Sequence, residues 1–260
     1  MSSPEDRRRS FDEAAETYDQ VRPSYPPDVF DTLFDLVPER PEIVEVGPGT
    51  GQATKDLLAR GASVRAVEIG PAMAAKLREK HVSKRLQVSV GDFEVLDIEP
   101  ASAHAVFSAT AYHWISRRAQ TDRPAVILRP GGVVAIVDLI QVDAPDDHGF
   151  FDAVQPIYER YGEPHTGPPA PTRHDVDPAI RAALQADRRF ADVCVRRYDW
   201  NQTYDAADYR KLMLSYSGTQ MMSEARRAGL LDSVEAFVRS EFGGVVTRPI
   251  VVTLTTAILR

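Results

Sequence analysis

The sequence predicts an α/β fold built on a largely parallel sheet, and three observations indicate it. Apolar strand-like runs alternate with helical patterns from residue 42 to residue 140. The first of these runs ends in a glycine-dense turn, Gly47-Pro48-Gly49-Thr50-Gly51. The run Val245–Leu259 is rich in valine, isoleucine and threonine, which is typical of a strand. Short apolar strands separated by single helices form parallel sheets with helices on both faces.

About the first half of the chain supplies most of these elements. Apolar residues between positions 10 and 37 recur at the spacing of two helices, which a proline-rich crossing separates. Strands are then predicted at residues 42–46, 63–69, 86–90, 104–109 and 132–140. Helical patterns fill the gaps around Leu57, around Met73 and from Ala119 to Leu128. In such sheets the ligand binds at the carboxyl ends of the strands.

After residue 140 the alternation stops. Five prolines fall within residues 162–178, a stretch too long for a simple connector, which indicates a lid or a binding loop. A strand is predicted over 192–198, and helices over 205–217 and 223–241. Cys194 lies within that strand pattern and is predicted to be a small core residue.

Composition excludes several classes of protein. The formal net charge of -7 argues against a nucleic-acid partner, because neutralising phosphates requires a basic surface. A single cysteine cannot form a disulfide framework or a cysteine-based metal cage, and the histidines are scattered, so no metal site is expected. There is no apolar run long enough to span a membrane and no signal-peptide core. We therefore expect a cytoplasmic protein without a membrane partner.

The glycine turn predicts a nucleotide-like cofactor, because glycine lets a ligand approach backbone N–H groups closely. The dinucleotide fingerprint Gly-x-Gly-x-x-Gly is not satisfied: counting from Gly47 its third glycine is Gln52, and counting from Gly49 it is Thr54. The pattern present is acidic-x-Gly-x-Gly-x-Gly, beginning at Glu45.

The ends of the next three strands strengthen the prediction. Glu68 ends the second strand, where a carboxylate could accept both hydroxyls of a ribose. Asp92 follows the third strand and could meet an adenine amino group, while Phe93 could cover the ring. Small residues, Ser108 to Ala111, end the fourth strand and leave room for a ligand tail. These strand ends form one coherent site.

A set of motifs spans residues 11–139 in one order. They are Phe11-Asp12-x-x-Ala15-x-x-Tyr18-Asp19, Arg22-Pro23-x-Tyr25-Pro26, Glu45-x-Gly47-x-Gly49-x-Gly51, Glu68, Gly91-Asp92, Tyr112-His113-Trp114 and Leu128-x-Pro130-Gly131-Gly132. With these motifs the chain resembles class I S-adenosylmethionine-dependent methyltransferases. The resemblance is greatest to their small-molecule branch, which includes trans-aconitate methyltransferase-like and ubiquinone-biosynthesis-type enzymes.

The resemblance implies a Rossmann-like sheet of seven strands in mixed direction, with the last strand antiparallel, helices on both faces and an inserted helical lid. It divides the chain into four segments. These are an N-terminal helical cap (1–40), a cofactor-binding core (41–140), the lid with its proline-rich loop (141–190), and a C-terminal part (191–260) that completes the sheet and caps the substrate.

The resemblance also assigns cofactor contacts. The turn of Gly47, Gly49 and Gly51 would pass under the methionine part of S-adenosylmethionine, and Glu45 would help to hold its amino group. The other contacts would come from Glu68 and Ile69 at the ribose, Asp92 and Phe93 at the adenine, Thr110 and Ala111 near the sulfonium, and Tyr18 and Arg22 closing over the cofactor from the N-terminal segment.

The acceptor side is less defined. His113 could be a catalytic base or a substrate contact, or it could cap the fourth strand; Trp114 is expected to pack. The expected reaction transfers a methyl group to an oxygen or nitrogen of a small molecule, such as a carboxylic acid, and Arg173 or Arg196 would matter for a carboxylate. The alternatives are a catalytically silent cofactor-binding sensor or partner subunit, and an NAD-dependent oxidoreductase. A monomer or homodimer is expected.

Overall fold

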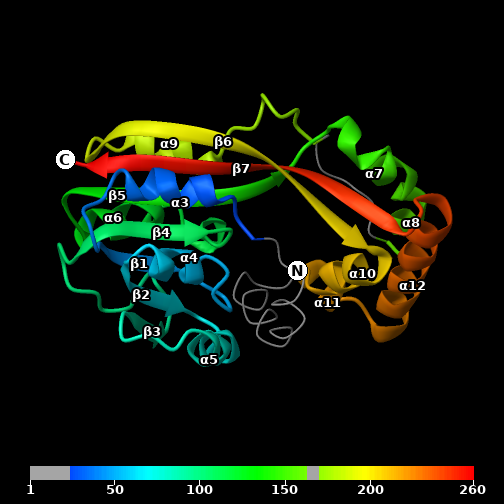
Figure 1. The fold of residues 1–260 in the computed structure, drawn as a ribbon, viewed down its shortest axis with the longest axis horizontal. Helices are drawn as coiled ribbons and strands as arrows, with labels where there is room; N and C mark the ends of the chain where they lie inside the picture. The colour runs from blue at the N-terminus through cyan, green and yellow to red at the C-terminus, as the bar shows by residue number, and fades with distance from the viewer. Residues whose placement is uncertain (1–23, 163–169) are drawn as a thin grey trace.

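A computed structural model describes residues 24–162 and 170–260, and a seven-stranded mixed sheet forms its centre (Figure 1). The strand order is β3-β2-β1-β4-β5-β7-β6. The first five strands pair in parallel, whereas β7 is antiparallel to both β5 and β6. The predicted fold class is thereby confirmed. The strands are β1 (Glu42–Val46), β2 (Ser63–Glu68), β3 (Leu86–Val90), β4 (Ala103–Ala109), β5 (Leu128–Gln141), β6 (Phe190–Asp205) and β7 (Val245–Leu259).

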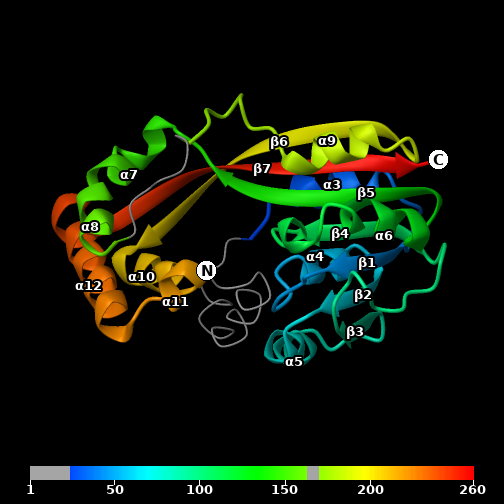
Figure 2. The ribbon, with the colours of Figure 1, turned by 180° about the vertical axis from the view of Figure 1, so that it is seen from behind.

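Helices cover both faces of this sheet (Figures 1 and 2). On one face lie α3 (Pro27–Phe34), α4 (Thr54–Ala59) and α5 (Pro71–Lys80), whose apolar residues pack against alternate residues of β1, β4, β5 and β7. On the other face lie α6 (Ala119–Ile127) and α9 (Ala179–Ala186). The two apolar layers hold the strand ends in fixed register, as a site shared by several strands requires.

Strands β6 and β7 continue beyond the rest of the sheet as a two-stranded extension. Pairing between β5 and β7 ends at Gln141 and Ile250, but β6 and β7 stay paired up to Asp205 and Val245. The extension leads into a helical part around Phe150, at the opposite end of the molecule from the C-terminus (Figure 1). The helical part consists of α7 (Phe150–Ala153), α8 (Gln155–Arg160), α10 (Ala206–Leu214), α11 (Ser217–Gln220) and α12 (Glu224–Glu241).

The segment 141–190, expected to form a lid, divides between two places. Its first helices, α7 and α8, pack in the helical part. Its last helix, α9, instead packs on the sheet beside α6, through the buried side chains of Ile180 and Leu184. The helical part therefore draws on two stretches of chain, and most of it is the connection between β6 and β7.

The prediction for Cys194 is wrong, because its side chain is exposed. It lies on β6, which is one of the two edge strands of the sheet. The register with β7 shifts between Ala191 and Cys194, and Asp192 has a φ of 51°. Such a bulge changes which residues of a strand face the core, and sequence alternation alone does not reveal it.

No helix among residues 24–162 and 170–260 is long and apolar enough to cross a membrane. Within the same ranges, no three histidine, cysteine, aspartate or glutamate side chains are grouped so that they could hold a metal ion.

Candidate functional site

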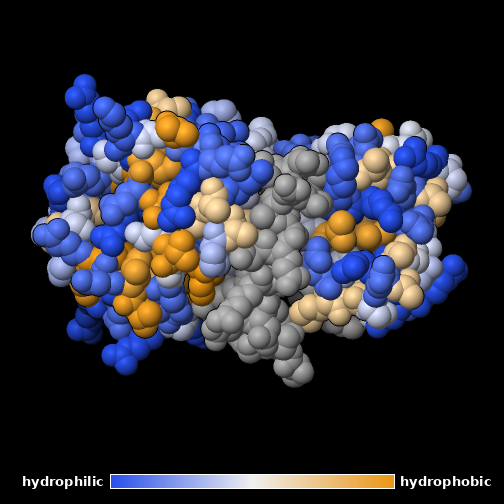
Figure 3. Space-filling model, turned by 90° about the horizontal axis from the view of Figure 1, so that it is seen from below, coloured by the Kyte–Doolittle hydropathy of each residue, from blue (hydrophilic) through white to orange (hydrophobic). Residues whose placement is uncertain are grey.

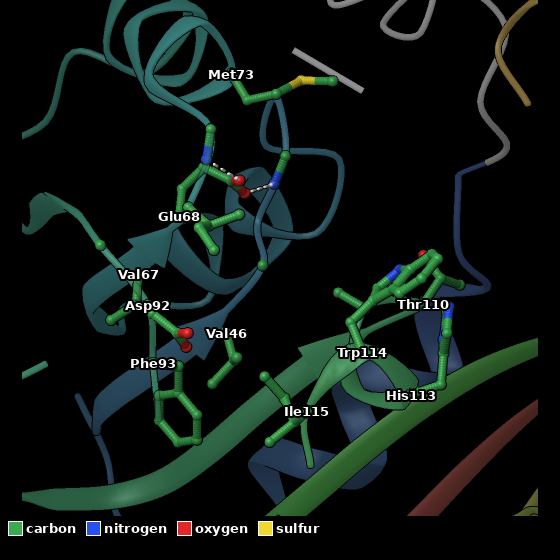
Figure 4. A pocket seen from close by; sticks show the side chains of 16 residues that line it. Val46, Val67, Glu68, Met73, Asp92, Phe93, Thr110, His113, Trp114 and Ile115 are labelled. Carbon is green, nitrogen blue, oxygen red and sulfur yellow. Dashed lines mark hydrogen bonds between the residues drawn. The ribbon is translucent and has the colours of Figure 1, made fainter. Parts of the chain in front are cut away.

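Four neighbouring strands end around one cavity of about 260 Å³ (Figure 4). Each strand contributes the residues that follow it, so the chain reaches the same place four times. The wall consists of Val46, Gly47 and Gly49 at the end of β1, Val67 to Gly70 at the end of β2 with Met73 of α5, Gly91 to Phe93 after β3, and Thr110, Ala111 and His113 to Ile115 after β4.

The turn after β1 depends on glycine for two reasons. Gly47 and Gly49 have φ values of 64° and 57°, a left-handed conformation that side chains other than glycine rarely adopt. A Cβ on Gly47 would also stand 2.5 Å from the Cβ of Ala111. The turn therefore lies directly against the loop after β4. Because Gly47 and Gly49 have no side chains, the backbone of the turn is open to a ligand in the cavity.

Glu68 fixes this turn from the neighbouring strand. Its Oε2 accepts a hydrogen bond from the N–H of Gly49 (3.0 Å), and its Oε1 accepts one from the N–H of Gly70 (2.9 Å), as Figure 4 shows. The side chain is buried but lines the cavity. An ionised carboxylate has about four acceptor positions, so it can hold the turn and also accept hydroxyl groups of a ligand.

Asp92 and Phe93 form the adjoining wall. Figure 4 shows the Asp92 carboxylate directed into the cavity beside the ring of Phe93. Asp92 Oδ1 accepts a hydrogen bond from the N–H of Glu94 (2.9 Å), and the guanidinium carbon of Arg123 lies 5.5 Å from the centroid of the Phe93 ring. A fixed acceptor next to a fixed aromatic ring suits a flat heterocycle that carries an amino group.

The loop after β4 is strained at the cavity. Thr110 has a φ of 57°, which is a rare conformation for a β-branched residue. Its N–H is bonded to the carbonyl of Val137 (2.8 Å), and its hydroxyl lies 3.2 Å from that of Tyr25. Backbone strain of this kind concentrates at functional sites.

His113 and Trp114 follow in a short 3-10 helix, η1 (Tyr112–Trp114). Their ring centroids are 4.9 Å apart, and both side chains line the cavity. Trp114 was expected to pack, but the fully buried position of η1 belongs to Tyr112, whose hydroxyl donates to the carbonyl of Gln120 (2.8 Å). His113 is exposed, yet partial desolvation at the cavity lowers the pKa of its imidazole, so the ring is mainly neutral and able to accept a proton near pH 7.

Two expected cofactor contacts do not reach the cavity wall. Glu45 is only 1% exposed, and its Oε2 accepts a hydrogen bond from the hydroxyl of Thr54 (2.7 Å). A Cβ on Gly51 would stand 2.6 Å from the side chains of His81 and Leu77, so this glycine is required for packing against α5. Glu45 thus connects β1 to the start of α4, and Gly51 packs against α5, so both residues position the turn without facing the cavity.

Burial gives Glu45 a measurable effect on stability. Desolvation raises its pKa to about 8, against an ordinary value of 4.5, so the folded protein holds a proton there that the unfolded chain has lost. The free energy of unfolding should therefore fall between about pH 5 and pH 8 by up to about 1.4 kcal/mol per pH unit from this group. Glu45→Gln should remove that slope. Urea unfolding of both proteins at several pH values tests it, and equal slopes would contradict the assignment.

Two expected cofactor contacts lie outside the described residues, and some residues that line the cavity were not predicted. The expected contacts outside the described residues are Tyr18 and Arg22. Met73 lies in the first turn of α5, which starts at the same edge of the sheet, and its helical position was the available signal. Ile115 follows the 3-10 helix, and nothing in its sequence context distinguishes it from a core residue.

The sheet order, the glycine turn and the shared cavity define a Rossmann-like α/β protein with a site for a nucleotide-type ligand. Comparison with known proteins indicates which class of α/β protein it resembles. Residues 44–136 match the profile of a family described as a methyltransferase domain. Over these residues the chain is similar to methyltransferase domains.

Curated relatives match over limited lengths. An uncharacterised methyltransferase of Mycobacterium tuberculosis (strain H37Rv) is 34% identical over 135 residues, which cover 52% of this chain and 54% of that protein. The malonyl-[acyl-carrier protein] O-methyltransferase of Halorhodospira halophila (strain SL1) is 37% identical over 114 residues, covering 41% of this chain and 38% of that protein. The chain therefore matches about half the length of these relatives or less.

Solved structures are similar over much more of the chain. A protein of Anaeromyxobacter dehalogenans, assigned as a type II methyltransferase, has a TM-score of 0.61 at 22% identity and covers 92% of this chain and 96% of its own. Phosphoethanolamine N-methyltransferase 2 of Haemonchus contortus, solved with S-adenosylhomocysteine, has a TM-score of 0.55 at 16% identity and covers 95% and 57%. At these identities the likeness shows the fold.

Proposed function

We propose that this protein is an S-adenosylmethionine-dependent methyltransferase that methylates an oxygen or nitrogen of a small organic molecule. The observation that supports it best is the position of Glu68, which fixes the glycine turn and faces the cavity at once. The family match over residues 44–136 and the S-adenosylhomocysteine in the Haemonchus structure support the same cofactor. We assign the protein to the small-molecule branch, acting in the cytoplasm as a monomer or homodimer.

The residues at the cavity suit the parts of this cofactor. The turn of Gly47 and Gly49 would lie under its methionine portion, and Glu68 would accept the ribose hydroxyls. Asp92 would accept the adenine amino group, with Phe93 against the ring. These contacts are the ones that the motif resemblance assigns, except that Glu45 and Gly51 act through the turn rather than at the ligand.

Bound S-adenosylmethionine supplies a methyl group that its sulfonium already activates. The protein has to align the acceptor, exclude water and remove a proton where the acceptor carries one. His113 Nδ1 or Nε2 could take that proton, because desolvation keeps the ring neutral and the side chain lies at the cavity wall. Trp114 and Ile115 line the same part of the cavity.

The cofactor assignment is tested by calorimetric titration of the protein with S-adenosylmethionine, S-adenosylhomocysteine and NAD in parallel. We expect micromolar binding of the first two ligands and none of NAD. Binding of NAD alone would favour an oxidoreductase. Binding of the first two without turnover of any acceptor would favour a silent sensor or partner subunit, whereas no binding at all would overturn the proposal.

His113→Ala should lower turnover at least 10-fold while leaving the dissociation constant of S-adenosylmethionine within about 3-fold, since a positioned general base contributes on the order of 100-fold or more. The rate should also lose its dependence on pH between 5 and 7. His174→Ala, at an exposed histidine away from the cavity, is the matched control. Equal turnover across this pH range would mean that His113 only closes the end of β4.

A further inference from the structure

A second and larger cavity, of about 910 Å³, lies at the helical part of the molecule. It is bounded by the end of β5, by β7 where that strand extends beyond β5, and by helices α7, α8, α10 and α12. It shares no wall residue with the first cavity. Its volume is within the range of small-molecule sites, roughly 300–1,000 Å³.

One cation faces this cavity from the extended strand. Arg248 is half-buried, and its Nε and Nη2 donate hydrogen bonds to Oε1 of Gln141 (3.3 and 3.1 Å). Among residues 24–162 and 170–260, no carboxylate lies within ion-pair distance of its guanidinium. A guanidinium carries five N–H donors, and a neutral amide oxygen leaves both donors and charge uncompensated. This arrangement favours an anionic ligand.

Two phenols add donors beside the guanidinium. The hydroxyls of Tyr158 and Tyr209 are 3.4 Å apart on the cavity wall. Burial raises the pKa of both groups, and both lie close enough to Arg248 for its charge to oppose that rise. Both phenols therefore stay protonated at neutral pH and can donate to an oxygen ligand.

The remaining wall limits what the anion can be. Met213 and Leu230 are buried and apolar, so they suit a carbon skeleton. Asp143, Asp152 and Glu159 line the cavity with exposed carboxylates and Asp147 with a half-buried one, and these would repel a ligand carrying several negative charges. One guanidinium matches one carboxylate, which it can bind through two parallel hydrogen bonds.

We propose that this cavity binds a small monocarboxylate, whose carboxylate pairs with the guanidinium of Arg248 and whose carbon skeleton lies against Met213 and Leu230. The inference goes beyond the proposed function: the two cavities share no wall residue, so the carboxylate is a second ligand at the helical part, distinct from the methyl acceptor at the first cavity. The two arginines considered from sequence are placed elsewhere. Arg173 forms ion pairs with Asp146 and Asp199 (2.7 and 3.2 Å), and Arg196 is exposed on β6.

Binding of defined probes tests the proposal without any turnover. The probes are benzoate and 3-phenylpropionate, their amides, and phenylphosphonate, each titrated by calorimetry into the wild-type protein and into Arg248→Gln and Arg248→Lys. Arg210→Gln is the matched control, because Arg210 lies on α10 beside Tyr209 but is ion-paired with Asp232 outside the cavity. We expect a carboxylate to bind at least 10-fold more tightly than its amide. Arg248→Gln should lose that preference, Arg248→Lys should keep part of it, and the control should keep it fully.

If Arg248→Gln does not fold, phenylglyoxal labelling of the wild-type protein replaces it, read as the mass of the peptide that contains Arg248. The carboxylate should slow labelling at this arginine and its amide should not. Equal affinity for carboxylate and amide, unchanged preference in Arg248→Gln, tighter binding of phenylphosphonate, or no binding of either carboxylate would each overturn the proposal. Titration with S-adenosylmethionine separates the carboxylate site from the proposed cofactor site. Arg248→Gln should bind S-adenosylmethionine as tightly as the wild type does. If S-adenosylmethionine does not bind the wild type, only the cofactor site is refuted.

Discussion

Gly49→Val is expected to abolish detectable binding of S-adenosylmethionine, a loss of at least 100-fold. The native φ of 57° places a valine in the left-handed region, which costs roughly 1–2 kcal/mol for a residue with a Cβ. Gly49 also lines the cavity, so the isopropyl group would take space that a ligand needs. Calorimetry gives the affinity and thermal unfolding gives the stability.

Gly243→Val separates strain from exclusion in that experiment. Gly243 has a φ of 59°, almost the same as Gly49, but an added Cβ there has no neighbour within 4 Å and the residue lies outside both cavities. Both variants should lose similar stability, and only Gly49→Val should lose the ligand. A Gly49→Val protein that still binds would mean that the cofactor does not lie on this turn.

Glu68→Ala is expected to weaken S-adenosylmethionine binding by about 2–4 kcal/mol, or roughly 30- to 1,000-fold. Hydrogen bonds to a charged group contribute about 1.5–3 kcal/mol each, and the substitution removes those to the ligand as well as those that hold Gly49 and Gly70. Titration of the purified variant measures the loss, and its melting temperature reports the loosened turn.

Glu68→Gln and Glu79→Ala complete this test. Glutamine keeps the shape but turns an amide N–H₂ toward one of the two backbone N–H groups, so binding should fall to an intermediate value. Glu79 is an exposed residue of α5 whose carboxylate forms an ion pair with Lys76 outside the cavity, so its loss should change nothing at the cavity. Unchanged affinity in Glu68→Ala would refute the assignment of this carboxylate to the ribose.

Sequence was sufficient for the sheet and for the wall of the first cavity, because both follow from local rules. Strand ends in a parallel sheet share an edge, so Gly49, Glu68 and Asp92 could be brought together without coordinates. These local rules do not show that Glu68 lines the cavity whereas Glu45 does not. Both are acidic residues in or at the end of apolar strands, and only the hydroxyl of Thr54 and the burial around Glu45 show that it faces inward.

The second cavity could not be predicted because its parts are distant in sequence. Arg248 meets Gln141 only through the long pairing of β7, 107 residues away along the chain. The bulge that turns Cys194 outward and the division of residues 141–190 between two places likewise depend on tertiary contacts. Aromatic residues such as Tyr158 and Tyr209 occur as often in a core as in a cavity wall, so type and spacing do not separate the two.

The unbroken course of β6 and β7 has a mechanical consequence. The same two strands complete the sheet at one end and carry the helical part at the other, as the ribbon in Figure 1 illustrates. We call the sheet with its covering helices one lobe and the helical part the other; both are seen in Figure 3. No hinge peptide joins the lobes at this point; instead, paired backbone hydrogen bonds run through the junction. Such a ribbon resists bending in its own plane and yields more readily to twisting. Relative movement of the lobes should therefore be a rotation about the strands, which would change the orientation of the two cavities toward each other more than their separation.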